Sequence, residues 1–311
     1  MSAHVLAVGE ALVDVVHRPD GSSEEHPGGS LANVALTLGR LGRDVRLATW
    51  LGRDARGDDV RAWLAESRVT LAGGSDGADR TSVAQATLDD TGAATYEFDL
   101  EWQVPAGTGA EDGTLAVHTG SIAAMLAPGD ADVRDLLATA RDTATITYDP
   151  NARPAIMGDA DAVRPRVEEI VALADVVKVS DEDLAWLYPG SDPLAVARAW
   201  QATGPALVAV TFGGEGATAV TAAGEATVAA PRVTVVDTVG AGDSFMGALL
   251  DELWSAGLLG AERRAALRAV PVADTEALLA RCAAVAAVTV SRAGANPPWA
   301  RELDLATKEN A

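Results

Sequence analysis

Short apolar runs alternate along the chain with longer segments in which apolar residues recur every three or four positions. The runs that predict strands lie at residues 5–8, 45–50, 115–118, 145–148, 176–179 and 206–211. They are apolar almost throughout rather than at alternate positions, which is typical of parallel strands buried on both faces. With right-handed helical crossovers between the strands, the pattern predicts an α/β fold, a doubly wound sandwich around a mostly parallel sheet.

One region breaks this rhythm. Residues 82–88 and 93–99 are rich in β-forming residues and are separated by turn residues 89–92, which predicts a hairpin. Residues 12–18 form another strand-like run directly after the first strand. We therefore expect a single domain, 1–311, with a small β-sheet made from segments near 12–26 and 82–102. The small sheet is either a lid over a site or an edge extension that forms a dimer contact, and one element can serve as both.

Charge restricts the partners. The chain has 24 basic and 45 acidic residues, a formal net charge of −21, and its two lysines are Lys178 and Lys308. Because no basic stripe exists, nucleic acid and anionic membrane are excluded as partners. A bound polyanion would have to be held by backbone amides and a metal ion. We also expect a soluble cytoplasmic protein with its one cysteine, Cys282, in the core, since no apolar run is long enough to span a membrane.

Two common nucleotide-binding motifs are missing. No Gly-Lys pair occurs, so a Walker A loop is impossible, and no strand is followed by the three-glycine fingerprint of a Rossmann dehydrogenase. The four histidines are scattered, which argues against a transition-metal site.

The most informative segment is Asp-Thr-Val-Gly-Ala-Gly-Asp-Ser-Phe, residues 237–245, which follows the β-like run 233–236 and opens an amphipathic helix. Glycines at 240 and 242 let a turn aim several N–H groups in one direction at a helix N-terminus. We predict an anion hole from Gly240, Ala241 and Gly242 that needs no lysine. Asp243 is either the N-cap of this helix or a general base that deprotonates a hydroxyl attacking a phosphate.

A second motif, Pro-Gly-Gly-Ser-Leu-Ala-Asn at residues 27–33, also precedes a helix. A tight turn into the helix would explain Gly28 and Gly29 but not Asn33. An amide in the first helical turn, beside glycines that permit close approach of the backbone, suits a polyhydroxylated ligand.

Together these two segments resemble the defining motifs of the ribokinase/PfkB family of carbohydrate kinases, in its fructokinase-like branch. Further matches follow in order along nearly the whole chain. They are Gly-Glu-Ala-Leu-Val-Asp (9–14), Asp-Pro-Asn-Ala-Arg (149–153), Lys-Val-Ser-Asp-Glu-Asp (178–183), Thr-Phe-Gly-Gly-Glu-Gly-Ala (211–217) and Ser-Arg-Ala-Gly-Ala (291–295). The resemblance implies the ribokinase-like fold with a small β lid, and the use of ATP, Mg²⁺ and a monovalent cation, K⁺.

The resemblance also implies roles for individual positions. The sugar would be held by Asp14, Gly28, Gly29 and Asn33, with Arg153 for a carboxylate-bearing substrate. Asp243 matches the catalytic base, and Gly240, Ala241 and Gly242 match the anion hole. The nucleotide-binding positions are Ser180, Thr211, Gly213, Gly216, Gly242 and Asn296. Asp237 would help to hold the monovalent cation.

The chain departs from the family pattern in two places. Ser180 and Asp183 stand where the family often has Asn-x-x-Glu near the Mg²⁺-phosphate water network, so that Asp183 would act on Mg²⁺ through water. The segment 96–102 lacks the arginine of many relatives. The leading hypothesis is an ATP-dependent kinase for a primary sugar hydroxyl, with fructose as the first choice. Alternatives are 2-keto-3-deoxygluconate kinase, then ribokinase or nucleoside kinase, and, in another class, a non-catalytic sugar or nucleotide sensor. A homodimer through the lid is expected, with Trp102 on its apolar edge.

Overall fold

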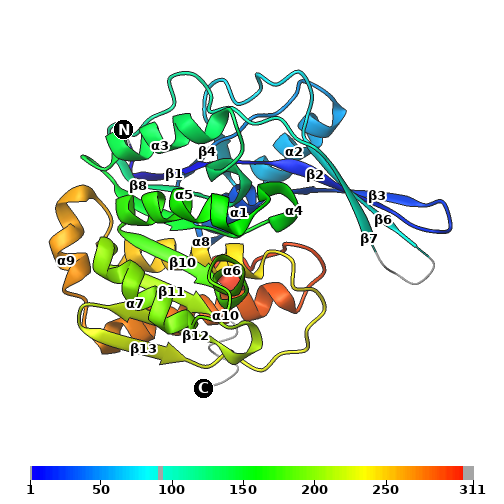
Figure 1. Cartoon of the computed structure of the whole chain (residues 1–311). Coiled ribbons are helices and arrows are strands. Elements are labelled where there is room, and N and C mark those ends of the chain that lie inside the picture. The colour runs from blue at the N-terminus through cyan, green and yellow to red at the C-terminus, as the bar shows by residue number, and fades with distance from the viewer. Residues whose placement is uncertain (1, 90–93, 304–311) are drawn as a thin grey trace.

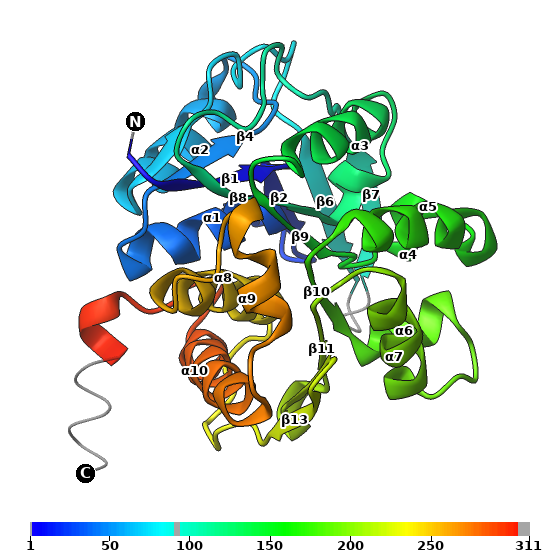
Figure 2. The same cartoon turned by 90° about the vertical axis from the view of Figure 1, so that its left-hand side faces the viewer.

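The computed structural model describes residues 2–89 and 94–303. A twisted sheet lies at the centre of the molecule (Figures 1 and 2). Its strand order is β13-β12-β11-β10-β9-β8-β1-β4-β5, parallel from β5 to β11 and antiparallel at the β12 and β13 edge. The strands are β1 (His4–Val8), β4 (Val45–Ala48), β5 (Val69–Leu71), β8 (Thr114–Gly120), β9 (Thr145–Asp149), β10 (Val176–Ser180), β11 (Leu207–Thr211), β12 (Ala217–Thr221) and β13 (Gly224–Val228).

Helices cover both faces of this sheet (Figure 2). One face packs against α1 (Ser30–Leu41), α2 (Ala55–Glu66), α8 (Ala241–Ser255) and α10 (Val272–Val290). The other packs against α3 (Gly129–Ala140), α5 (Ala160–Leu173), α6 (Asp181–Leu187) and α7 (Pro193–Thr203). Shorter segments are α4 (Pro154–Met157), α9 (Arg264–Arg268) and the 3₁₀ turns η1 (Ser121–Ala124), η2 (Gly213–Glu215) and η3 (Ala261–Arg263). The two cores make the doubly wound sandwich that the apolar runs predict.

A small sheet projects beyond one edge of this body, with the order β3-β2-β6-β7 (Figure 1). Its strands are β2 (Leu12–His17), β3 (Ser23–Gly28), β6 (Val83–Leu88) and β7 (Ala94–Asp99). Cross-strand pairing places His26, Asp14, Ala84 and Phe98 in one row. Because directly paired residues share a face, Asp14 and the exposed aromatic residues of β7 lie on the same side of the small sheet.

The main-sheet runs, the hairpin and the small sheet are confirmed, whereas the turn between β6 and β7 includes residues 90–93, which lie outside the described residues. The prediction misses β5, β12 and β13, which are short or lie at the sheet edges. Residues 233–236 are not a strand, contrary to expectation. Val235 and Val236 are each 60% exposed, and the segment is held by a hydrogen bond from Val236 N to Val290 O, at the C-terminus of α10, rather than by a neighbouring strand.

Trp102 is not an exposed edge of the lid, which corrects the sequence prediction. It is 2% exposed and its indole N–H donates to the carbonyl of Ala123 at 2.9 Å. The aromatic residues that the small sheet exposes are Tyr96 and Phe98, whose rings stack. Cys282 lies in the core as expected. Among the described residues, none of the helices combines the length and apolar character required to cross a membrane.

Candidate active site

Asp243 lies in the first turn of α8, but it is not the N-cap of that helix. Gly240 takes the N-cap position in a left-handed conformation, with φ 75°. A methyl group at Gly240 would come within 2.6 Å of the Ala295 side chain, so the turn also requires a residue without Cβ. The capping interpretation of Asp243 is therefore wrong. Its carboxylate is directed elsewhere, although the residue is only 6% exposed.

Three side chains donate hydrogen bonds to this carboxylate. Ser30 Oγ lies 2.7 Å from Oδ1, Asn33 Nδ2 lies 2.8 Å from Oδ2, and Asn151 Nδ2 lies 3.3 Å from Oδ1. Ser30 and Asn33 come from the first turn of α1, which packs closely along α8. These donors fix the orientation of the carboxylate, which a general base requires to meet the proton it removes.

Asn151 is a site residue that the sequence analysis did not select, although it lies in the quoted segment 149–153. Its φ of 35° is in the left-handed region, where asparagine is tolerated better than most residues. Asp149 Oδ1 accepts its backbone N–H at 3.2 Å, and Arg153 donates to its side-chain oxygen at 2.7 Å. The signal was present in the sequence, because Asn151 and Arg153 follow the carboxyl end of the buried strand β9, where parallel sheets place their sites.

The residues expected to hold a sugar lie beside this carboxylate, where the small sheet joins α1. Leu12 pairs with Gly28, and a methyl group at Gly28 would meet Asp14 Oδ2 at 2.3 Å. Gly29, with φ 107°, leads directly into α1. Desolvation raises the pKa of Asp14, and the positive charge of Arg153 opposes this rise. The glycines thus allow Asp14 to approach the helix that carries Asn33.

Glu10 is a buried carboxyl at the same junction. Its Oε1 accepts the backbone N–H of Ser30 at 3.1 Å, and Oε2 has no hydrogen-bond partner. Burial raises the pKa of Glu10 to about 7, opposed by hydrogen bonds that include one from Ser121. Glu10 therefore holds the residue that donates to Asp243, but it does not contact Asp243 itself.

The predicted anion turn at Gly240, Ala241 and Gly242 lies next to a buried lysine. A methyl group at Gly242 would come within 2.8 Å of Lys178 Nζ. Lys178 comes from β10 and pairs with Asp149 at 2.7 Å between Nζ and Oδ2. The sequence pattern concealed this charge because Lys178 stands inside an apolar strand.

The other predicted nucleotide-binding positions lie at or just after the carboxyl ends of β10 and β11. Ser180 ends β10 and caps α6, where its Oγ accepts the N–H of Asp183 at 3.0 Å. Asp183 Oδ1 accepts the N–H of Ala152 at 2.8 Å, so the side chain anchors the 149–153 segment. Thr211 ends β11, and Gly213 and Gly216 bound the turn that follows.

Asp237 and Asn296 make contacts within the protein. Both oxygens of Asp237 accept backbone N–H groups, from Val239 at 3.0 Å and from Gly294 at 2.8 Å. Asp237 thus ties the segment before α8 to the loop after α10. The side-chain oxygen of Asn296 accepts from Arg40 at 2.6 Å, on the side of α1. The structure therefore gives both residues bracing contacts, and their roles toward a cation and a nucleotide stay predictions.

A divalent cation would find few protein ligands here. Within residues 2–89 and 94–303, no group of three or more His, Cys, Asp or Glu side chains is arranged to hold a metal ion. Mg²⁺ in proteins keeps several waters and takes one or two carboxylates together with phosphates. Asp183, whose charge acts on the ammonium of Lys178 next to Gly242, is the carboxylate predicted for this role, and the role stays a prediction.

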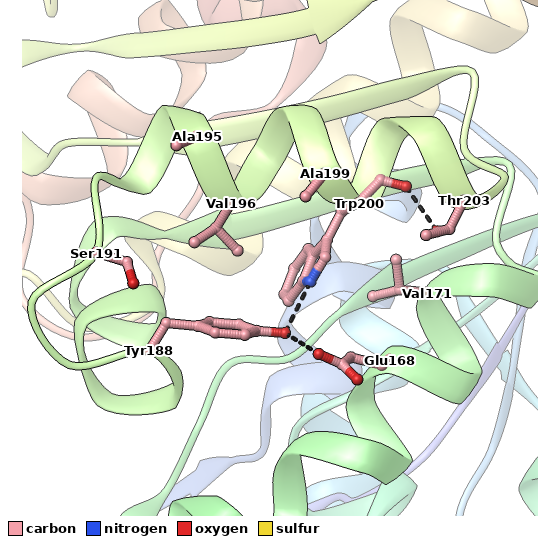
Figure 3. A pocket seen from close by; sticks show the side chains of 9 residues that line it. All are labelled: Glu168, Val171, Tyr188, Ser191, Ala195, Val196, Ala199, Trp200 and Thr203. Carbon is pink, nitrogen blue, oxygen red and sulfur yellow. Dashed lines mark hydrogen bonds between the residues drawn. The ribbon is translucent and has the colours of Figure 1, made fainter.

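A hollow of about 470 Å³ lies apart from this site, between α5 and α7 (Figure 3). Tyr188 lines this hollow. Its hydroxyl donates to Glu168 at 2.5 Å and accepts from Trp200 at 3.0 Å. The walls are otherwise mostly apolar, and none of the residues discussed above lines the hollow.

The doubly wound sheet, the small flanking sheet and the glycine turn before α8 define an α/β protein of the ribokinase-like fold. The family model described as "pfkB family carbohydrate kinase" matches residues 2–301 of this chain. The chain therefore belongs to the PfkB family of carbohydrate kinases and is a phosphotransferase that acts on a sugar hydroxyl.

Individual relatives agree with this assignment. The chain is 34% identical over 264 residues to a fructokinase from Rhizobium leguminosarum bv. trifolii, a match that covers 80% of this chain and 79% of that protein. Among solved structures, fructokinase with bound ATP from Xylella fastidiosa aligns over 100% of both chains, with a TM-score of 0.84 and 25% identity. Aminoimidazole riboside kinase from Salmonella enterica, complexed with aminoimidazole riboside and an ATP analogue, aligns over 97% of this chain and 99% of that one, with a TM-score of 0.76 and 26% identity.

Proposed function

We propose that this protein transfers the γ-phosphoryl group of ATP to a primary hydroxyl of a sugar, with Asp243 as the general base. The hydroxyl proton passes to the Asp243 carboxylate as the sugar oxygen forms its bond to phosphorus and the bond to the ADP oxygen breaks. The amides of Gly240, Ala241 and Gly242 would stabilise the charge on the transferring group. The observation that carries the proposal is the buried carboxylate of Asp243, held by three donors beside this turn.

Fructose, giving fructose 6-phosphate, is the substrate we favour, because curated relatives that share about a third of their residues with this chain are fructokinases. Asp14, Gly28, Gly29 and Asn33 would bind its hydroxyls. A 2-keto-3-deoxygluconate substrate is the second candidate, because the exposed guanidinium of Arg153 lies close enough to Asp14 for its charge to oppose the rise that burial causes in the pKa of that carboxyl. A ribose or nucleoside substrate follows, supported by the likeness to a riboside kinase.

ATP would lie along Ser180, Thr211, Gly213, Gly216 and Gly242, with Asn296 near the base. Mg²⁺ would supply the positive charge that a chain of net charge −21 lacks, and Asp183 would contact its water shell. We therefore expect ATP affinity to depend strongly on Mg²⁺. Asp237 would brace a loop that binds K⁺. The exposed aromatic face of the small sheet would form the contact of a homodimer.

The proposal is tested by measuring ADP release against a sugar panel that includes fructose, 2-keto-3-deoxygluconate, ribose and a nucleoside. Asp243→Asn should lower kcat by about 10² to 10⁴, the usual contribution of a general base. The matched control is Asp251→Asn, on the same helix but paired with Arg43, which should keep wild-type kcat. Failure of every sugar would favour a non-catalytic sensor, and an Asp243→Asn variant as active as the wild type would remove Asp243 from the mechanism.

A further inference from the structure

Lys178 is a fully enclosed cation at the centre of the main sheet. Its side chain is 3% exposed and that of its partner Asp149 is 1% exposed. A buried charge is costly unless it is paired, and an ion pair in the core is often no better for stability than apolar residues of similar size. Stability therefore does not explain why a charged residue is buried against Gly242, and we look for a functional explanation.

Lys178 faces more negative charge than one partner provides. The carboxylates of Asp149, Asp183 and Asp243 all act on its ammonium. Burial alone would lower the pKa of Lys178, but the attraction to these carboxylates outweighs it, so the pKa is raised and the side chain stays charged. A positive charge thus lies beside the Gly240–Gly242 turn, where a methyl group at Gly242 would meet it.

A chain of contacts connects this ion pair to Asp243. Asp149 binds Lys178 through Oδ2 and accepts the backbone N–H of Asn151 through Oδ1. Asn151 Nδ2 in turn reaches Ser30 Oγ at 2.7 Å and Asp243 Oδ1 at 3.3 Å. Because Asn151 has a left-handed backbone, it depends on such contacts to keep its side chain aimed at Asp243.

We propose that Lys178 is a positioning residue for phosphoryl transfer, which holds Asp243 through Asp149 and Asn151 and adds positive potential to the turn at Gly242. This inference rests on the proposed role of Asp243. In the alternative case, Lys178 only neutralises the buried carboxylate of Asp149. The two cases differ in what happens when both charges are removed together.

The test compares Asp149→Asn with the double variant Lys178→Met/Asp149→Asn. The asparagine can still accept the N–H of Asn151, so the comparison isolates the ammonium. We expect the double variant to unfold cooperatively near the wild-type temperature, to keep its KM for the sugar within about threefold, and to lose about 10²-fold in kcat relative to Asp149→Asn. A single-turnover measurement should place the loss in the chemical step. A double variant whose kcat is within about twofold of that of Asp149→Asn overturns the proposal.

A matched control comes from the opposite end of β10. Arg264 pairs with the buried Asp175 at 2.7 Å, away from the site. Arg264→Met/Asp175→Asn should change the unfolding temperature without changing kcat, which separates the loss of a buried pair from the loss of this particular charge. If the double variant at 178 and 149 does not fold, Lys178→Gln/Asp149→Asn, which also removes both charges but keeps a polar side chain at each position, gives the same comparison with Asp149→Asn, with the same expected loss in kcat and the same twofold limit.

Failure of the inference and failure of the proposed function are distinguishable. An active Asp243→Asn variant removes the base, and with it the role of Lys178. An inactive Asp243→Asn variant, together with a double variant whose kcat matches that of Asp149→Asn, overturns the role of Lys178 alone.

Discussion

The side-chain amide of Asn33 donates to Oδ2 of Asp243 at 2.8 Å, although the two residues are 210 positions apart in the chain. This bond joins the first turn of α1 to the first turn of α8, and both turns follow glycines. The residue expected to bind the sugar is therefore in contact with the residue expected to take its proton. The proposed sugar-binding residue and the proposed base thus belong to one hydrogen-bonded unit.

Asn33→Asp should disturb this hydrogen-bonded unit, because it places a second carboxylate beside that of Asp243. Two carboxylates at hydrogen-bond distance cannot both ionise easily, so the pair would retain a proton to higher pH. We expect the acid limb of the kcat profile to move up by about one pH unit or more, and kcat at pH 7 to fall by about tenfold to a hundredfold. The measurement is kcat from about pH 5 to 9 at saturating sugar and ATP.

Ser30→Ala is the control for this prediction, because it removes a neutral donor from the same carboxylate without adding charge. It should lower kcat and leave the acid limb closer to its wild-type position than Asn33→Asp does. Equal displacement of the limb in the two variants would contradict the electrostatic explanation.

Asn151 combines backbone strain with a functional side chain, and two substitutions separate these properties. Asn151→Gly and Asn151→Ala both remove the donor to Asp243. With φ at 35°, alanine should cost about 1 kcal/mol more than glycine in the free energy of unfolding. We expect kcat to be lowered equally, by roughly tenfold or more, since a catalytic hydrogen bond is lost in both. Urea unfolding and steady-state kinetics check this, and an alanine variant more stable than the glycine variant would contradict it.

The apolar runs predicted the buried parallel strands, and the glycine patterns predicted the two turns that hold Asn33 and Asp243, because each depends on local pattern. Asp14 was selected because it matches a family motif, and the site roles of all three residues stay predictions. The sequence did not predict the proposed role of Lys178, because that role depends on Asp149, which only the parallel pairing of β9 with β10 brings close. Trp102 was misplaced for a related reason. A tryptophan after a hairpin is expected to be exposed unless another segment covers it, and here the 121–129 segment buries it.

Glu10 should make stability depend on pH. Its pKa is about 7 in the folded protein against 4.5 ordinarily, so between these values the folded state holds a proton that the unfolded chain has released. Its contribution to stability is therefore lost as pH rises from about 4.5 to 7. Glu10→Gln lacks this titration and keeps an oxygen for the N–H of Ser30. Its stability relative to the wild type should improve by about 3 kcal/mol between about pH 4.5 and 8.

The measurement is the free energy of unfolding in urea across this pH range, taken as the difference between the two proteins so that other titrating groups cancel. Glu24→Gln is the control, because Glu24 is an exposed carboxylate whose pKa is lowered by hydrogen bonding to Arg18. It should keep the wild-type fall in stability from about pH 4.5 to 7. A Glu10→Gln variant with the same fall would show that Glu10 is not its source.

Trp102, just after the small sheet, and Tyr96, on its exposed face, should have different roles, the first in stability and the second in a dimer contact. Trp102→Phe leaves the buried carbonyl of Ala123 without its donor, which should cost about 1 to 3 kcal/mol of unfolding free energy. Tyr96→Ser, at a side chain 60% exposed on the face shared with Asp14, should change stability by less than about 0.5 kcal/mol but shift a homodimer toward monomer. Urea unfolding and sedimentation velocity distinguish the two effects. A Tyr96→Ser protein with the wild-type sedimentation coefficient at every concentration would exclude this face as a dimer contact.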